Sequence, residues 1–340
     1  MQGSRWLDCA RSFRHLLRRK RNPLAKSPAG DCAYAFGHLD RPARGPVFIG
    51  GTGRSGTTVL ARLLGQHPRI FVYRWETQLI VAPGGLVDLL RNLNTPAALA
   101  QFSSRMRGPW FRRVLYAGQP EEYSAGLCAD LSWEEVEPVL AIFENLIKLG
   151  GGREQPLRLG AEFLDALSLS AMERAKAHRW GEKTPRNIFY IAQLWRLFPN
   201  MRFVHILRDG RDVVSSMLEN GFWPIAPSPE YPSSLGFRGE MSFEKAVDYW
   251  VEMLKIARYS AAQVPPENYL EIRLEDLAED PVSNLQRLMD FLGEPLTEEL
   301  LQFDLSRARA GRWKKDLSAA QIRYFHQQAG EILEREGYTV

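Results

Sequence analysis

A glycine-rich stretch near residue 50 has the composition of an anion-binding loop. Residues 50 to 60 read GGTGRSGTTVL, which from Gly51 is G-x-x-x-x-G followed by Thr57 and Thr58. Loops that bind nucleoside triphosphates carry Lys-Ser or Lys-Thr there, and the lysine contacts the β- and γ-phosphates. A loop without that lysine should favour an anionic ligand that lacks a γ-phosphate.

The same loop offers two kinds of hydrogen-bond donor. A glycine turn that leads into a helix presents backbone N–H groups and the positive end of the helix dipole to an oxyanion. We expect Ser55, Gly56, Thr57 and Thr58 to supply those amides, with the threonine hydroxyls as further donors. Arg54 lies inside the loop, where its planar guanidinium can bind one edge of a phosphate or sulfate. The alternative is a tight turn without a ligand.

A second candidate anion site, R-D-G-R-D-V-V-S-S, spans residues 208 to 216 directly after an apolar run. Arg208 would leave the carboxyl end of a strand, beside the crevice where doubly wound sheets bind ligands. Ser216, two helical turns further on, could donate to the same anion. Two alternatives stay open: the charges could form an ion-pair cluster, or Asp209 could hold magnesium as in a nucleoside triphosphatase.

Strands and helices alternate along the chain in a way that would position these residues. Apolar runs predict buried strands at 46–50, 70–73, 202–207 and 268–274. Helical spacing predicts helices at 59–65, 132–150, 209–217, 242–254, 281–293 and 319–335. Such alternation implies a parallel sheet covered on both faces. The predicted fold class is α/β, a P-loop NTPase-like three-layer parallel sheet with a helical insertion.

Three regions outside the expected sheet have distinct compositions. Residues 1–45 form a basic N-terminal arm and linker, and residues 46–340 form the main domain. A mostly helical insertion is expected at about 84–178. Residues 220–241, with four prolines, predict a long loop, and long ordered loops are often functional lids.

Charge is concentrated in the arm. The net charge is +4, but residues 1–44 hold ten Lys or Arg and three Asp, so the other residues sum to −3. That distribution argues against a nucleic-acid-binding surface. Residues 4–20 have the pattern of a basic amphipathic helix, which could bind a membrane surface, contact a partner subunit or pack on its own domain.

Cysteine content and hydropathy bear on the compartment. The three cysteines form no C-x-x-C pair, which argues against a disulfide framework or a structural zinc site and fits a reducing compartment. No apolar stretch approaches 18 residues, so we expect neither a transmembrane anchor nor a secretory signal. The expected location is cytoplasmic, with peripheral membrane contact as an option.

Three motifs in this order together resemble the sulfotransferase family. They are G-R-S-G-T-T at 53–58, L-R-D-G-R-D-V-V-S-S at 207–216 and G-R-W-K-K-D-L-S at 311–318. Members transfer a sulfuryl group from 3′-phosphoadenosine 5′-phosphosulfate (PAPS), leaving adenosine 3′,5′-bisphosphate (PAP). The resemblance begins at about Pro46. Cytosolic small-molecule members have lysine where this chain has Arg54, and in this respect the chain resembles the carbohydrate, protein-tyrosine and bacterial types.

The resemblance implies donor-binding roles. Residues 54 to 58 would hold the 5′-phosphosulfate, and Arg208 with Ser216 would hold the 3′-phosphate. Arg312 or Lys314 would close over the nucleotide, with Trp313 beside it or packed in the core. The family often has tyrosine ahead of its Glu-Asp-Leu, near adenine, but this chain has Leu274 there.

The resemblance also implies catalytic residues. Lys183, in Gly-Glu-Lys-Thr-Pro, matches the family lysine near the transferred sulfate, and Glu76 lies where related members carry the glutamate that takes the acceptor's proton. The plainer alternatives are a salt bridge from Glu76 to Arg74 and a solvated surface lysine at 183. Cationic side chains can stabilise sulfuryl transfer, so we expect Arg54 and Lys183 to act without a metal.

The expected activity is PAPS-dependent sulfation of a hydroxyl on a sugar, lipid, small molecule or tyrosine. The alternatives are a P-loop kinase or triphosphatase that uses Asp209 for magnesium, and a nucleotide-binding protein without catalysis. The missing loop lysine disfavours the first. The presence of Arg54, Glu76 and Lys183 disfavours the second.

Overall fold

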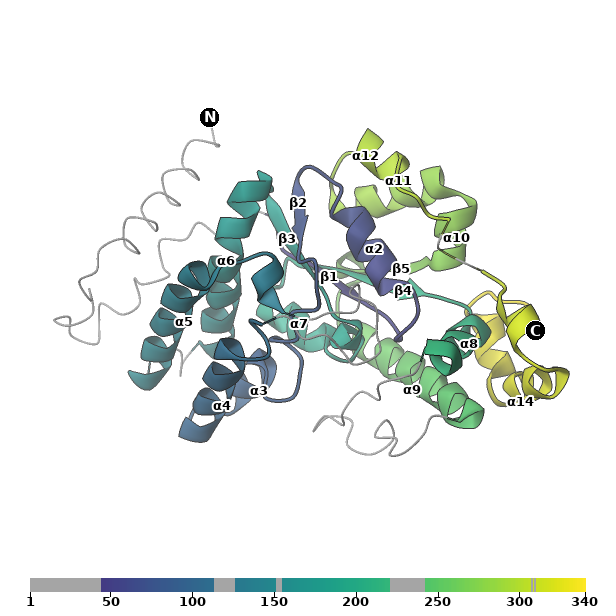
Figure 1. Ribbon diagram of the computed structural model, residues 1–340, viewed down its shortest axis with the longest axis horizontal. Helices are drawn as coiled ribbons and strands as arrows, with labels where there is room; N and C mark the ends of the chain where they lie inside the picture. Colours follow the sequence, from purple (N-terminus) through teal and green to yellow (C-terminus); the bar gives the residue numbers. More distant parts are fainter. Residues whose placement is uncertain (1–43, 113–125, 151–154, 221–241, 307, 309) are drawn as a thin grey trace.

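A parallel sheet forms the centre of the computed structural model, which describes residues 44–112, 126–150, 155–220, 242–306, 308 and 310–340 (Figure 1). Its five strands lie in the order β2-β3-β1-β4-β5. Their bounds are β1 Val47–Gly50, β2 Ile70–Val72, β3 Arg179–Lys183, β4 Arg202–Leu207 and β5 Tyr269–Arg273. Every neighbouring pair is parallel, so all the carboxyl ends lie at one edge. The predicted α/β class is confirmed.

Helices cover both faces of the sheet, because apolar side chains alternate along the strands. Val47 and Ile49 of β1 pack into one cluster, and Phe48 between them packs into the other. The first cluster includes α2 (Thr57–Leu64), α10 (Leu274–Glu279), α11 (Pro281–Leu292) and α12 (Glu298–Leu301). The second includes α7 (Ile191–Leu197), α8 (Gly210–Asn220), α9 (Phe243–Ala261) and α14 (Ala319–Arg335). Short helical turns complete the described elements: η3 Leu127–Ala129, η4 Pro185–Phe189, η5 Pro266–Asn268 and α13 Trp313–Asp316.

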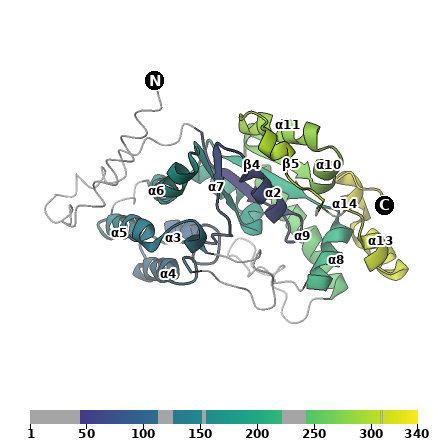
Figure 2. The ribbon, with the colours of Figure 1, turned by 45° about the horizontal axis from the view of Figure 1, so that its top comes forward.

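Among the described residues, four α-helices stand between β2 and β3, inside the predicted insertion. They are α3 (Leu86–Arg91), α4 (Pro96–Arg107), α5 (Trp133–Lys148) and α6 (Pro156–Ala175). Figures 1 and 2 show α3, α4 and α5 grouped on the side of the molecule away from α8 and α14. Phe143 of α5 stacks on Phe163 of α6 with ring centroids 4.2 Å apart. The group shares the second cluster with the sheet, so its core is continuous with that face.

Helix ends follow the capping signals in the sequence. The side chains of Ser132 and Ser318 form capping boxes at the starts of α5 and α14. Ser242 caps α9 through its side chain, and Asp280 does the same for α11. Gly293 ends α11 with φ 66°, a left-handed conformation that glycine adopts without a Cβ clash.

Strand β3 was not expected, since its sequence R-W-G-E-K is rich in charge. All five residues are buried, including Arg179, Glu182 and Lys183. Each of those three charged side chains has a hydrogen-bond partner outside the strand, which makes burial tolerable.

Some predicted features lie outside the described residues. These are the amphipathic helix at 4–20, most of the arm and linker at 1–45, and nearly all of the loop at 220–241. Membrane or subunit contact through residues 4–20 stays a prediction, as does the cytoplasmic location. Within the described ranges, none of the helices combines the length and apolar character that a bilayer crossing needs.

Candidate active site at the carboxyl edge of the sheet

The strand order brings the sequence candidates to one edge. In spatial order, the residues that follow the strands are Glu76 after β2, Lys183 at the end of β3, the loop 51–56 after β1, Arg208 after β4 and Leu274 after β5. A backbone hydrogen bond of 3.3 Å from Gly51 N to Pro185 O ties the start of the loop to the segment after β3. The edge is therefore a continuous row of candidate side chains.

The loop has the backbone geometry of an anion cradle. Gly56 has φ 97° and precedes α2, whose first N–H groups have no acceptor within the helix. Arg54 has φ 71°, a left-handed conformation that costs a non-glycine residue about 1–3 kcal/mol. Such strain is retained where the surrounding structure requires it, as at ligand sites. The loop therefore aims backbone donors at a point beyond the start of α2.

Ser55 provides a test of whether an anion fits the loop. Its side chain is fully buried, and its Oγ has no hydrogen-bond partner among the residues that the structure describes. A Cβ placed on Gly51 would lie 2.5 Å from that oxygen, so only glycine leaves room beside it. A buried hydroxyl without a partner is costly, and an oxyanion held by the loop would accept a hydrogen bond from it. The loop residues fit an anionic group.

Arg54 joins the loop to the second anion motif. Its Nε donates to Ser216 Oγ at 2.9 Å, and its carbonyl oxygen accepts from Arg208 Nη1 at 3.0 Å. Burial lowers the pKa of Arg208; Asp212, 3.8 Å away, opposes that effect and Arg54 adds to it. Two guanidinium groups and a serine hydroxyl thus gather beside the loop, an arrangement suited to an anion with more than one phosphate or sulfate group.

Asp209 is engaged by a neighbouring arginine. Its Oδ1 accepts from Arg211 Nε at 2.9 Å and its Oδ2 from Arg211 Nη2 at 2.7 Å. Its backbone N–H donates to Glu275 Oε1 at 2.9 Å, which fixes the turn. Both carboxylate oxygens are therefore used by an ion pair rather than held open for magnesium. In the described ranges, no group of three or more His, Cys, Asp or Glu side chains is placed to hold a metal ion.

Glu76 and Lys183 form an ion pair, with Lys183 Nζ 3.0 Å from Glu76 Oε1. Lys183 is only 3% exposed, so the interpretation as a solvated surface lysine is wrong. The suggested salt bridge from Arg74 to Glu76 is also wrong, because Arg74 pairs with Asp130 at 3.0 Å. A carboxylate and an ammonium group thus face each other at the end of two neighbouring strands.

Glu182, which the sequence did not single out, positions that pair. Its Oε1 accepts from Thr77 Oγ1 at 3.0 Å and from Thr184 Oγ1 at 2.6 Å, so it holds the residues next to Glu76 and Lys183. Its Oε2 accepts from Asn187 Nδ2 at 2.7 Å. Burial raises the pKa of this fully buried carboxyl, although the hydrogen bonds oppose the shift. A Gly-Glu-Lys-Thr-Pro string alone gives no sign of this role.

The C-terminal motif packs against α8 beside Arg208. Asp212 accepts from Gly311 N at 2.7 Å and from Trp313 N at 2.9 Å, which fastens the segment to the helix. The Trp313 ring lies 4.0 Å from the Arg211 guanidinium carbon, so it packs on a cation here.

The two basic candidates of this motif differ in their surroundings. Arg312 forms ion pairs with Glu219 at 2.8 Å and Asp316 at 2.6 Å. Lys314 is exposed, and its Nζ lies 5.7 Å from the Trp313 ring centroid. Lys314 is therefore the more available of the two cations for a bound anion.

Leu274 packs against the loop. It is buried at the start of α10, and a Cβ on Gly56 would lie 2.9 Å from each of its two terminal methyl carbons. The Leu274 side chain therefore packs directly against the backbone of the anion-binding loop at Gly56.

Most of the chain is similar to known proteins. Residues 46–298 match the sequence model of the sulfotransferase family. Omega-hydroxy-beta-dihydromenaquinone-9 sulfotransferase Stf3 of Mycobacterium bovis is 29% identical over 162 residues, which cover 46% of this chain and 40% of that protein. Protein-tyrosine sulfotransferase A of Caenorhabditis elegans is 22% identical over 258 residues, 76% of this chain and 52% of that protein.

Among solved structures, the sulfotransferase domain from the curacin biosynthetic pathway has a TM-score of 0.49 and 17% identity, and the match covers 84% of this chain and 98% of that one. The chain spans about half or less of the two curated relatives, with 40% of one and 52% of the other matched. The family model, by contrast, covers most of the chain, from residue 46 to residue 298. The protein belongs to the sulfotransferase family.

Proposed function

We propose that the protein transfers a sulfuryl group from PAPS to a hydroxyl group of an acceptor. The observation that carries this proposal is the hydrogen bond of 2.9 Å between Arg54 and Ser216, which unites the two predicted phosphate sites. The ion pair of Glu76 with Lys183 at the same edge supports it. Family membership points to the same chemistry.

Two groups of residues would hold the donor. The amides of residues 55 to 58, the Ser55 hydroxyl and Arg54 would bind the 5′-phosphosulfate. Arg208 and Ser216 would bind the 3′-phosphate, with Lys314 closing over the nucleotide. PAPS supplies an activated sulfuryl group whose leaving group is a phosphate. A sulfate bears less charge than a terminal phosphate, so these cations suffice without the lysine of triphosphatases.

Transfer then needs a base on one side and positive charge on the other. Glu76 would accept the proton of the attacking hydroxyl. General-base catalysis of this kind accelerates a reaction by about 10²–10⁴. Lys183, bonded to Glu76 in this structure, would turn toward the transferring group and stabilise the charge that builds on it. The pairing places the proposed base and cation 3.0 Å apart. Glu182 keeps both backbones in register through Thr77 and Thr184.

The proposed acceptor class is a hydroxyl-bearing compound: a sugar, a lipid, a small molecule or a tyrosine. One relative is named for an omega-hydroxy menaquinone derivative and another for protein tyrosine. The chemistry they share is a hydroxyl nucleophile, which is what a carboxylate base at Glu76 would activate.

A thermal-shift comparison followed by an activity assay tests the proposal. PAP should raise the melting temperature, whereas ATP with magnesium should raise it less. PAP release from PAPS should then depend on an added hydroxyl acceptor. Stabilisation by ATP and magnesium alone would favour the kinase alternative and remove this proposal. Stabilisation by PAP without turnover on any acceptor would indicate a nucleotide-binding protein that lacks catalysis.

A further inference from the structure

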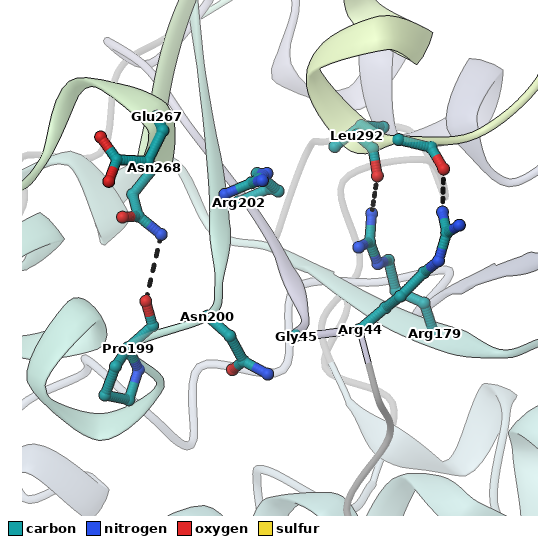
Figure 3. Close-up of a pocket in the computed structure, with 10 residues that line it drawn as sticks. Arg44, Gly45, Arg179, Pro199, Asn200, Arg202, Glu267, Asn268 and Leu292 are labelled. Carbon is teal, nitrogen blue, oxygen red and sulfur yellow. Dashed lines mark hydrogen bonds between the residues drawn. The ribbon is translucent and has the colours of Figure 1, made fainter.

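A cavity of about 380 Å³ opens at the amino edge of the sheet, at the other end of the strands from the loop (Figure 3). Three arginines line it: Arg44 lies three residues before β1, and Arg179 and Arg202 are the first residues of β3 and β4. β3 and β4 flank β1 in the sheet. The cations meet because neighbouring parallel strands begin at the same edge.

One donor of each arginine caps the end of α11. The bonds run from Arg202 Nε to Phe291 O at 2.9 Å, from Arg179 Nη1 to Leu292 O at 2.8 Å, and from Arg44 Nη1 to Gly293 O. Figure 3 shows Arg44 and Arg179 pointing at this helix end. The last carbonyls of a helix lack internal donors, and together they carry about half a negative charge. Capping therefore accounts for one nitrogen of each guanidinium and for a fraction of the charge.

Positive charge remains in excess at the cavity. Glu294 accepts from Arg44 at 2.7 Å, and exposed Glu267 is the one carboxylate among the described residues that line the cavity. Arg179 is 4% exposed, and its Nε has no hydrogen-bond partner within the described part of the chain. Burial lowers the pKa of Arg179 to about 10; Glu294 opposes the shift, while Arg44 and Arg202 add to it. A buried guanidinium with an unused donor and two cationic neighbours is an arrangement that an anion would relieve.

We propose that this cavity is a second anion site, which binds phosphate, sulfate or a small compound that ends in one of these groups, through Arg179 and Arg202. Its volume lies in the range of about 300–1,000 Å³ that small-molecule sites occupy. Asn200, which also lines the cavity, adds an amide donor. Glu267 limits the ligand to a compact anion and would repel a larger polyanion. The site is remote from Arg54, so its ligand does not compete with PAPS.

Calorimetric titration with inorganic phosphate, in chloride buffer with PAP in excess, tests this site. PAP is present to fill the loop at the opposite edge. Asn200 and Glu267 are exposed residues of the cavity, and exchanging them removes none of the three arginines that cap α11. Asn200→Asp should weaken phosphate binding about tenfold by adding a negative charge, and Glu267→Gln should strengthen it several-fold by removing one. A general effect on folding would not weaken phosphate binding in one variant and strengthen it in the other.

Arg202→Gln supplies the direct test, with Arg196→Gln, an exposed residue of α7, as its matched control. We expect Arg202→Gln to abolish phosphate binding and Arg196→Gln to leave it unchanged. Should Arg202→Gln fail to fold, the outcome rests on the Asn200 and Glu267 exchanges. Absence of phosphate binding in the wild-type protein, or binding that neither of those exchanges alters, would show that the arginines are helix caps only. If PAP did not fill the loop, phosphate could bind there instead. Such binding would not respond to the Asn200 and Glu267 exchanges, so it would not be mistaken for binding in the cavity.

Discussion

Arg54 and Ser216, 162 positions apart in the chain, are joined by a hydrogen bond of 2.9 Å. Arg54 comes from the turn after β1, and Ser216 comes from α8, which follows β4. Because β1 and β4 are neighbours, the bond links the ends of two adjacent strands. The position of the Arg54 guanidinium therefore depends on α8 as much as on the loop itself.

Arg54→Ala should weaken PAP binding by at least about tenfold, since a charge-assisted hydrogen bond contributes roughly 1.5–3 kcal/mol. Arg54→Lys should be intermediate, because lysine keeps the charge and loses the planar fork. Calorimetry of PAP binding measures both. Arg62→Ala, an exposed arginine of α2, is the control and should bind PAP normally. Equal affinity of the Arg54→Ala and Arg62→Ala proteins would remove Arg54 from the donor site.

Glu76→Gln should lower kcat by about 10²–10⁴ and leave PAP affinity within a factor of a few. The amide keeps the size of the side chain but cannot accept the proton. Turnover of PAPS and calorimetry with PAP separate the two effects. Glu137→Gln, an exposed residue of α5, should change neither. Full activity in Glu76→Gln would exclude Glu76 as the base.

Lys314→Ala should weaken PAP binding several-fold, whereas its exposed neighbour Lys315→Ala should not. Arg312→Ala should have the smaller effect of the two motif cations, because Glu219 and Asp316 already occupy its guanidinium. The expected reason is that Lys314 is available to meet a nucleotide phosphate. PAP affinities of the three variants at equal ionic strength provide the measurement. The reverse ranking, with Arg312 dominant, would mean that the ion pairs open on binding.

Glu182→Gln should change how stability depends on pH. Burial raises the pKa of Glu182 in the folded protein above the unfolded value of about 4.3. Between those two values the folded state holds more protons, so the wild-type free energy of unfolding falls as pH rises. Glutamine does not titrate, so the free energy of unfolding of the variant should rise relative to that of the wild type from pH 4.5 towards pH 7. Urea unfolding across that range measures the difference, and a constant difference would refute the shift.

Glu271 should act in the opposite direction. Burial alone would raise its pKa, but hydrogen bonds and charge from His205, with hydrogen bonds from Arg258 and Tyr269, lower it to about 2. Its contribution to stability is therefore present above the unfolded pKa of about 4.3 and is lost as pH falls towards 2. Glu271→Gln should be less stable than the wild type at pH 7, and the gap should narrow in acid. Parallel unfolding curves at pH 7 and pH 3 would contradict this.

The apolar strands were predictable, and the charged one was not. β1 and β4 appear as short apolar runs, whereas R-W-G-E-K of β3 shows neither β-branched residues nor alternation. Its charges can be buried only because partners far along the chain, such as Leu292 for Arg179 and Thr77 for Glu182, satisfy them. That information lies in tertiary contacts, which a local pattern does not contain.

The candidate site divides in the same way. The loop and the Arg208 motif were visible as local patterns, because glycine spacing and strand-to-helix transitions are short-range signals. Which residues pair was not visible: Glu76 stands two positions from Arg74 in sequence but bonds Lys183, 107 positions away. Adjacent strands decide that pairing, and the sequence pattern had offered no strand at 179–183.

The helices α3 to α6 leave the sheet after Glu76 and return to it at β3, which ends at Lys183. Glu76 and Lys183 therefore lie at the two ends of the chain segment that forms α3 to α6 and β3, and their ion pair joins those ends. A change in the length of this segment would act on the ion pair first, and it would reach the loop through the β3–β1 ladder and through the hydrogen bond from Gly51 N to Pro185 O. The segment between them is not a separable unit, because its helices share one apolar core with the sheet and its last strand, β3, pairs with both β2 and β1.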